Sequence, residues 1–221
     1  MSIENINLRK LLRIMYAPEA LRVSLLRSDI REEIAKADGV TAAGGDFYGP
    51  FWSDAKDHTT GRRELHAATE ERIAANPRRA NLYPQLRDGF LLWWNERRRW
   101  TNAPFVAIDA PKGRLDFTAL NSVVKIENFL AINDSNAEPH FVYPYFSLSP
   151  ILNEEAARLA LWAIREIGNV QDSSTIRVLD VIRGSTYSLE RNPLIGDEGA
   201  RFELRYRNLI SQWNELWDEY D

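Results

Sequence analysis

The chain has 221 residues, which is long enough to bury one substantial core. Its formal net charge of −4 gives no overall electrostatic attraction to nucleic acid or to an anionic membrane. It contains no cysteine, which excludes disulfides, thiol catalysis and cysteine-ligated zinc. The N-terminus lacks the pattern of a signal peptide, and no apolar run approaches the ~18 residues of a membrane span. We therefore expect a cytoplasmic protein with no membrane partner.

The chain begins with amphipathic helices. The first has an apolar stripe at helical spacing, made of Leu8, Leu11, Leu12 and Met15. Pro18 suits the first turn of a second helix, and Ser28-Asp29 can cap a third that ends before Gly39. The basic residues on their other faces indicate a solvated side. A helix-turn-helix DNA reader is the alternative, but no recognition turn is marked. These helices are equally compatible with a homodimer interface.

The glycine-rich stretch from Gly39 to Pro50 is the clearest loop, and it lacks the Lys-Ser/Thr of a nucleotide-binding P-loop. Four potential metal ligands follow this loop. Three precede a helix predicted near residues 62–75, and the fourth lies within it. They are Asp54, Asp57, His58 and His66. Carboxylates and imidazoles suit Zn, Mn or Fe, but the spacing matches no established signature. Helix capping by Ser53 or Asp54 is the simpler interpretation.

Pro84 opens the strongest helix of the N-terminal half, and its end combines three tryptophans with three arginines. These residues are Trp93, Trp94, Arg97, Arg98, Arg99 and Trp100. Arginine is favoured at a helix C-terminus, and its stem can pack on tryptophan faces, which explains the pattern structurally. The functional interpretation is a partner-binding surface, where arginines contact phosphates and rings stack on bases.

From Pro104 the hydrophobic period changes to that of strands. Residues 105–109 and 114–120 flank a Pro-Lys-Gly turn and predict a hairpin. Residues 123–148 then predict a long antiparallel hairpin around a turn at 133–136. One face of its first arm carries Val124, Ile126, Leu130 and Ile132. Pro144 cannot donate to a ladder, so the return arm should be an edge strand or carry a bulge.

The last third reads as a helix, a hairpin and a terminal helix. Asn153 caps the first helix, which carries Glu154 and Glu155 in its first turn, and Gly168 is its C-cap. Residues 175–182 and 186–189 predict a hairpin around Arg183-Gly184-Ser185. The terminal helix has a stripe at helical spacing, containing Phe202, Tyr206, Leu209, Ile210 and Trp213.

One constellation in the strand region resembles a known enzyme family. Strand-borne Asp116, then Glu127 with Lys125 on the same face, followed by a broad apolar helix, resembles the core order of PD-(D/E)XK nucleases over residues 114–167. The resemblance implies that Asp116 and Glu127 bind Mg²⁺, which activates water for phosphodiester attack with help from Lys125. Position 129 is Phe where the family has Lys, and Lys125 precedes the acid instead. Cross-strand charge pairing explains Lys125 and Glu127 without catalysis.

We therefore predict an α+β fold, with a helical region over residues 1–102 and an antiparallel sheet packed by two amphipathic helices over residues 103–221, in one compact domain. The first functional hypothesis is a non-catalytic intracellular binding or regulatory protein without a cofactor. It would contact a protein or nucleic-acid partner through the tryptophan- and arginine-rich surface. The alternative is a Mg²⁺-dependent, PD-(D/E)XK-like nuclease, complete or degenerate, that uses Asp116, Glu127 and Lys125.

Overall fold

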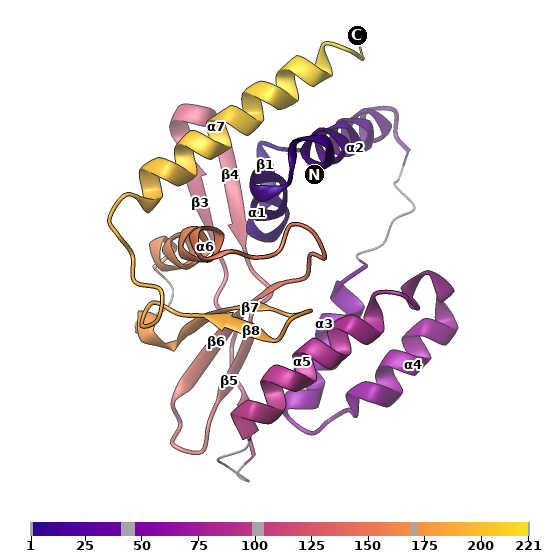
Figure 1. Cartoon of the computed structure of the whole chain (residues 1–221), viewed down its shortest axis with the longest axis vertical. Coiled ribbons are helices and arrows are strands. Elements are labelled where there is room, and N and C mark those ends of the chain that lie inside the picture. Colours follow the sequence, from indigo (N-terminus) through magenta and orange to yellow (C-terminus); the bar gives the residue numbers. More distant parts are fainter. Residues whose placement is uncertain (1, 41–46, 99–103, 169–171, 221) are drawn as a thin grey trace.

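The computed structural model describes residues 2–40, 47–98, 104–168 and 172–220. It combines helices at both ends of the chain with two β-sheets (Figure 1), so the predicted α+β class is confirmed. In the described residues, no helix has the length and apolar character that crossing a membrane requires.

The N-terminal half is mainly helical. Its elements are β1 (Asn5–Asn7), α1 (Leu8–Tyr16), α2 (Glu19–Ala37), α3 (Gly49–Thr59), α4 (Leu65–Ala75), a 3-10 turn at Pro77–Arg79, and α5 (Tyr83–Arg98). The second and third predicted helices are one, because α2 runs through Ser28-Asp29 without a break. Asp29 does not cap a helix there: its carboxylate accepts hydrogen bonds from Lys10 and from the Trp213 indole instead.

The remaining strands and helices follow from residue 106 onward. They are β2 (Val106–Ala107), β3 (Gly113–Phe117), a 3-10 turn at Thr118–Leu120, β4 (Ser122–Ile126), β5 (Leu130–Asn133), β6 (Pro139–Tyr145), α6 (Glu154–Glu166), a 3-10 turn at Ser173–Thr175, β7 (Ile176–Asp180), β8 (Ser185–Tyr187) and α7 (Glu198–Trp217). Asn153 caps α6 as predicted, since its Oδ1 accepts the Ala156 amide at 2.8 Å. Gly168 follows with a positive φ of 66°.

The strands form two sheets, in the orders β1-β4-β3 and β2-β5-β6-β7-β8. The predicted β7–β8 hairpin is confirmed, with Asp180 opposite Ser185. Each sheet also contains one parallel pair, β1 with β4 and β6 with β7. Because β1 pairs with β4, the start of the chain shares a sheet with residues beyond 103.

The predicted hairpin partners differ from the observed ones. The hairpin between residues 105–109 and 114–120 is wrong: β2 pairs with β5, whereas β3 pairs with β4. The long hairpin is correct only for β5 and β6, because β4 belongs to the other sheet. Asn128, with a φ of 69°, turns the chain between β4 and β5. Local alternation cannot reveal such a switch, since both strands are apolar.

Pro144 lies on a central strand, not on the predicted edge. β6 has β5 on one side and β7 on the other. However, β5 begins at Leu130, which pairs with Val142, so β5 does not extend to residue 144. The missing proline N–H therefore removes no hydrogen bond to β5.

The centre of the five-stranded sheet is buried on both faces. Along β6 and β7, alternate side chains enter two separate cores. Tyr143 and Val178 pack with α1, α6 and α7, while Val142 and Leu179 pack with α3 and α5. Figure 1 shows α3, α4 and α5 as one group beside this sheet, and α2 alongside α7 at the other end of the molecule.

Candidate functional site

Trp93 and Trp94 belong to the core, not to a surface. Their exposed fractions are 7% and 1%, and Trp94 packs on Phe105 with ring centroids 4.9 Å apart. Phe90, Trp93 and Trp94 lie on one helical face, which anchors α5 to the sheet. Neither ring is open to a partner, so the predicted stacking surface loses these two members. Arg99, Trp100 and the side chain of Arg98 lie outside the described part of the chain.

Arg97 continues the buried face of α5 and reaches the sheet. Its Nη2 lies 3.2 Å from Nδ1 of His140, whose Nε2 lies 3.2 Å from Oδ2 of Asp134. A guanidinium only donates, so Nδ1 must accept and Nε2 must carry the proton that binds Asp134. The imidazole in this chain of contacts is therefore neutral. Burial lowers the pKa of His140, and Arg97 lowers it further, although the hydrogen bond to Asp134 acts in the opposite direction.

Two more arginines lie near this contact. Arg177 on β7 pairs with Val142, so it shares the α5-facing side of the sheet with His140, two residues away along β6. Burial lowers the pKa of Arg97, the charge of Arg177 lowers it further, the charge of Asp134 raises it, and that of Arg191 lowers it. We call Arg97, Arg177 and Arg191 the arginine cluster. Among the described residues, none of these guanidinium groups forms an ion pair with a carboxylate.

Two acids, Asp134 and Glu190, lie near enough to the cluster for their charges to raise the pKa of Arg97 and of Arg177. Asp134 accepts the amides of Asn136 and Glu138 as well as the His140 proton. Glu190 raises the pKa of Arg177 through its charge, against a larger lowering by burial. In the part of the chain that the structure describes, the Arg177 Nη1 donates to two backbone carbonyls, at 3.0 Å for Ile176 and closer for Ser174. The cluster is thus a partly buried site of positive charge.

Sequence reasoning found Arg97 but missed Arg177 and Arg191. One signal was present: Arg177 interrupts a strand, Ile176–Asp180, whose other residues are all buried. A long cationic side chain inside such a strand is costly unless it serves packing or binding. The convergence with α5 follows only from the tertiary fold.

The candidate nuclease residues Asp116, Lys125 and Glu127 are spread along the three-stranded sheet. Asp116 lies opposite Val123, and Lys125 lies opposite Arg114, so Asp116 and Lys125 share a face diagonally. Glu127 follows the end of β4, four residues beyond Val123, or ~13 Å at the rise of a strand. Both carboxylates are exposed, and the register does not bring them together. In the described residues, no group of three or more His, Asp or Glu side chains could hold a metal.

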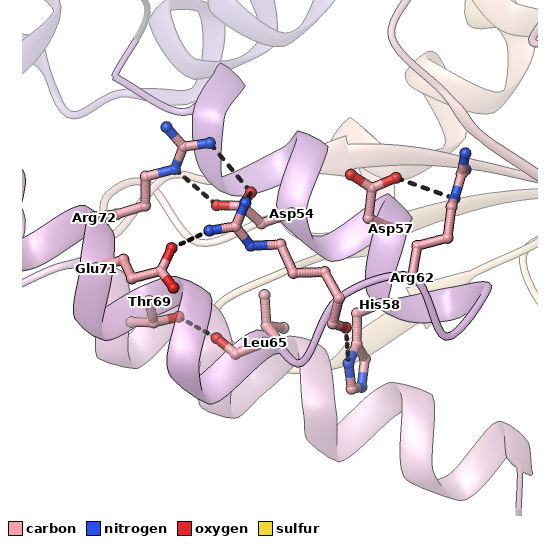
Figure 2. A network of polar contacts seen from close by, with 9 residues as sticks. Asp54, Asp57, His58, Arg62, Leu65, Thr69, Glu71 and Arg72 are labelled. Atoms are coloured by element: carbon pink, nitrogen blue, oxygen red, sulfur yellow. Dashed lines mark hydrogen bonds and ion pairs between the residues drawn. The ribbon is translucent and has the colours of Figure 1, made fainter.

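Three of the other candidate ligands, Asp54, Asp57 and His58, form a structural network, shown in Figure 2, whereas His66 is exposed on α4. Asp54 is buried on α3, and it accepts hydrogen bonds from Arg72 Nε at 2.8 Å and Nη2 at 3.1 Å. Arg63 adds a contact to Asp54 at 3.5 Å. Asp57 pairs with Arg62 at 3.3 Å, while His58 Nδ1 contacts the Arg63 carbonyl. These contacts join α3 to α4 and leave no shared metal site.

The chain is thus a mixed α+β protein whose predicted binding segment combines a buried tryptophan anchor with a cationic cluster. Comparison with protein families, with curated proteins and with solved structures found no match for this chain. Its function must therefore be inferred from the chemistry of its side chains.

Proposed function

We propose that the protein is a non-catalytic binding protein that contacts the phosphate backbone of a nucleic acid through the arginine cluster. The observation that carries this proposal is the position of Arg97 and Arg177 on one face of the sheet, near a neutral His140, with neither guanidinium in an ion pair among the described residues. Like charges held near one another repel, and a bound anion would offset that repulsion. Guanidinium groups suit phosphate because they donate two parallel hydrogen bonds.

The geometry favours a fixed, extended anion over a single small ion. Arg97 comes from a helix, Arg177 from a strand, and Arg191 from the loop after β8. Rigid elements hold the first two groups, so little side-chain entropy is lost on binding. A run of phosphates can engage cations that come from several elements in this way.

No comparable observation favours the nuclease alternative, since Glu127 follows the end of β4, away from the strand position opposite Asp116. It remains an untested prediction. The proposed binding function requires no Mg²⁺ or other cofactor. The cytoplasmic location and the homodimer also remain proposals, the first consistent with the lack of cysteine.

The test is a salt series of binding measurements with labelled single-stranded DNA, single-stranded RNA and duplex DNA. We expect binding at low salt that weakens steeply between roughly 50 and 200 mM salt, because phosphate contacts release counterions. Arg177→Gln should reduce the slope of log K against log salt by about 1, the value for one lost phosphate contact. Arg97→Gln should do the same.

The matched control is Arg78→Gln, which removes an exposed arginine beyond α4 and should leave the slope unchanged. Circular dichroism checks that each variant folds. Wild-type protein that binds none of the three nucleic acids at low salt would disprove the proposal, as would unchanged slopes in both cluster variants. Binding to polyglutamate but not to nucleic acid would identify an acidic protein as the partner and also contradict it.

A further inference from the structure

A second cationic site lies beyond the other end of β6 from His140, between α1, α2 and the residues that follow β6. A cavity of about 260 Å³ opens there, lined among others by Arg9, Arg13, Leu25, Tyr48 and Phe146. It joins the two groups of helices, since α1 belongs to one core and Phe146 to the other. Clefts between structural units are common sites for small ligands.

Aromatic rings, not a carboxylate, hold Arg9. Tyr48 and Phe146 stack with centroids 5.0 Å apart and planes at 6°. The Arg9 guanidinium lies 4.9 Å from the Phe146 centroid and 5.6 Å from that of Tyr48. Such contacts attract a cation but leave its N–H donors free for another partner. Arg9 is thus fixed in position while keeping its hydrogen-bonding capacity.

Arg13, one helical turn from Arg9, is also uncommitted. Its Nε is buried and makes no hydrogen bond. Within the described residues, neither Arg9 nor Arg13 forms an ion pair with a carboxylate. A buried donor without a partner is unfavourable, so an acceptor that pairs with this guanidinium would stabilise the site.

The acids of the cavity have their own partners. Lys10 lies 2.5 Å from Asp29 and 3.6 Å from Glu32, and the Trp213 indole donates to the other Asp29 oxygen. Asp29 is completely buried, so its charge is neutralised within the protein. The cavity is lined by three cations and two acids, and among the described residues both acids pair with Lys10, not with the two arginines.

We propose that this cavity binds a small organic anion. Its carboxylate or phosphate group would pair with Arg9 and Arg13, and its apolar body would lie against Ile14 and Leu25. The volume is at the lower end of the ~300–1,000 Å³ of ligand pockets, which fits one ring bearing one anionic group. This site shares no residue with the arginine cluster, so the two proposals stand or fall separately.

Isothermal titration calorimetry on the full chain tests the proposal with four probes. Phenyl phosphate and benzoate carry both a ring and an anion, inorganic phosphate carries only the anion, and benzyl alcohol carries only the ring. We expect at least one of the two organic anions to bind about tenfold or more tightly than both inorganic phosphate and benzyl alcohol, because only these anions use both halves of the cavity. Arg13→Gln and Arg9→Gln should each weaken this binding by about tenfold or more, the usual effect of a lost charged hydrogen bond.

Arg31→Gln is the control, since it removes an exposed arginine of α2 that does not itself line the cavity. Thermal unfolding checks each variant, and Arg13→Lys, which keeps the charge without the planar fork, replaces any variant that fails to fold and should still weaken binding. Failure of both organic anions to bind overturns the proposal. Equal weakening by Arg31→Gln, or affinities unaffected by changes at Arg9 and Arg13, would overturn it as well.

Discussion

Gly89 of α5 and Gly184 of the β7–β8 turn are in backbone contact. A Cβ on Gly89 would lie 2.2 Å from the carbonyl oxygens of Val181 and Ile182, and one on Gly184 would lie 2.7 Å from the Gly89 oxygen. Both distances are shorter than any real contact, so only glycine allows the helix to approach the turn this closely. Arg97 lies eight residues beyond Gly89, about two helical turns, so this approach also positions Arg97 toward the sheet.

Gly89→Ala should therefore lower the free energy of unfolding by about 3 kcal/mol, the upper part of the usual range for overpacking. Urea denaturation measures the change. Gly168→Ala is the control, because Gly168 has open space around it and a φ of 66°. An alanine there meets no neighbouring atom, and its only cost is the left-handed backbone conformation. That variant should lose about 1 kcal/mol. A smaller loss in Gly89→Ala than in Gly168→Ala would contradict the close packing.

Asp54→Asn should destabilise the protein by about 2 to 3 kcal/mol, because it leaves Arg72 and Arg63 without their buried partner. Asp57→Asn on the same helix is the matched comparison. Its partner Arg62 is largely exposed, so we expect a change of about 0.5 kcal/mol or less. Chemical denaturation of both variants gives the difference. Equal losses of stability in the two variants would show that the buried Asp54 ion pairs contribute no more to stability than the exposed Asp57–Arg62 pair.

His140 should make the stability of the protein depend on pH. Its pKa in the fold is lowered below the ordinary value of 6.5 by burial and by Arg97 and Arg177. The unfolded chain then binds protons more readily, so stability is full above pH 6.5 and falls as the pH drops through the lower folded pKa. NMR titration of the imidazole gives this pKa directly.

In His140→Asn, which retains an acceptor for Arg97 but does not titrate, this part of the acid destabilisation should disappear. His66→Asn changes an exposed imidazole and serves as the control. Should NMR give His140 a pKa above 6.5, the neutral imidazole between Arg97 and Asp134 would be the wrong description.

Trp94→Ala should cost about 3 to 5 kcal/mol of stability, the usual loss for a buried aromatic ring. This prediction separates a core role from the stacking role suggested by the sequence. Thermal and chemical unfolding are the measurements, with nucleic-acid binding by the folded fraction as the second readout. A variant of unchanged stability that binds nucleic acid more weakly would support the stacking role instead.

Mg²⁺ should not bind at Asp116 and Glu127 as a pair. The register puts ~13 Å of strand between Glu127 and the residue opposite Asp116, and an ion needs both carboxylates at ~2.1 Å. Calorimetry with MgCl₂ on wild type and on Asp116→Asn should give identical, negligible heats. A saturable Mg²⁺ site lost in Asp116→Asn and in Glu127→Gln would revive the nuclease alternative.

The helices α6 and α7 were legible in the sequence because the information is local. The stripe of α7 repeats every three or four residues, and Asn153 caps α6 through an amide only three residues away. The β7–β8 hairpin was equally accessible, since Gly184 with a φ of 64° marks its turn. In each case the interacting groups are neighbours in the chain.

Only the tertiary structure decided which strands pair and which charges meet. β4 joins β1 from the start of the chain, and Arg97 meets His140 across 43 residues. The same apolar alternation fits several strand partners, so the choice depends on burying both faces of the sheet at once. The cluster of arginines and the cavity beside Arg9 and Arg13 arise from that packing. The sequence determined the elements, and long-range burial determined their partners, because side-chain periodicity specifies a face but not what covers it.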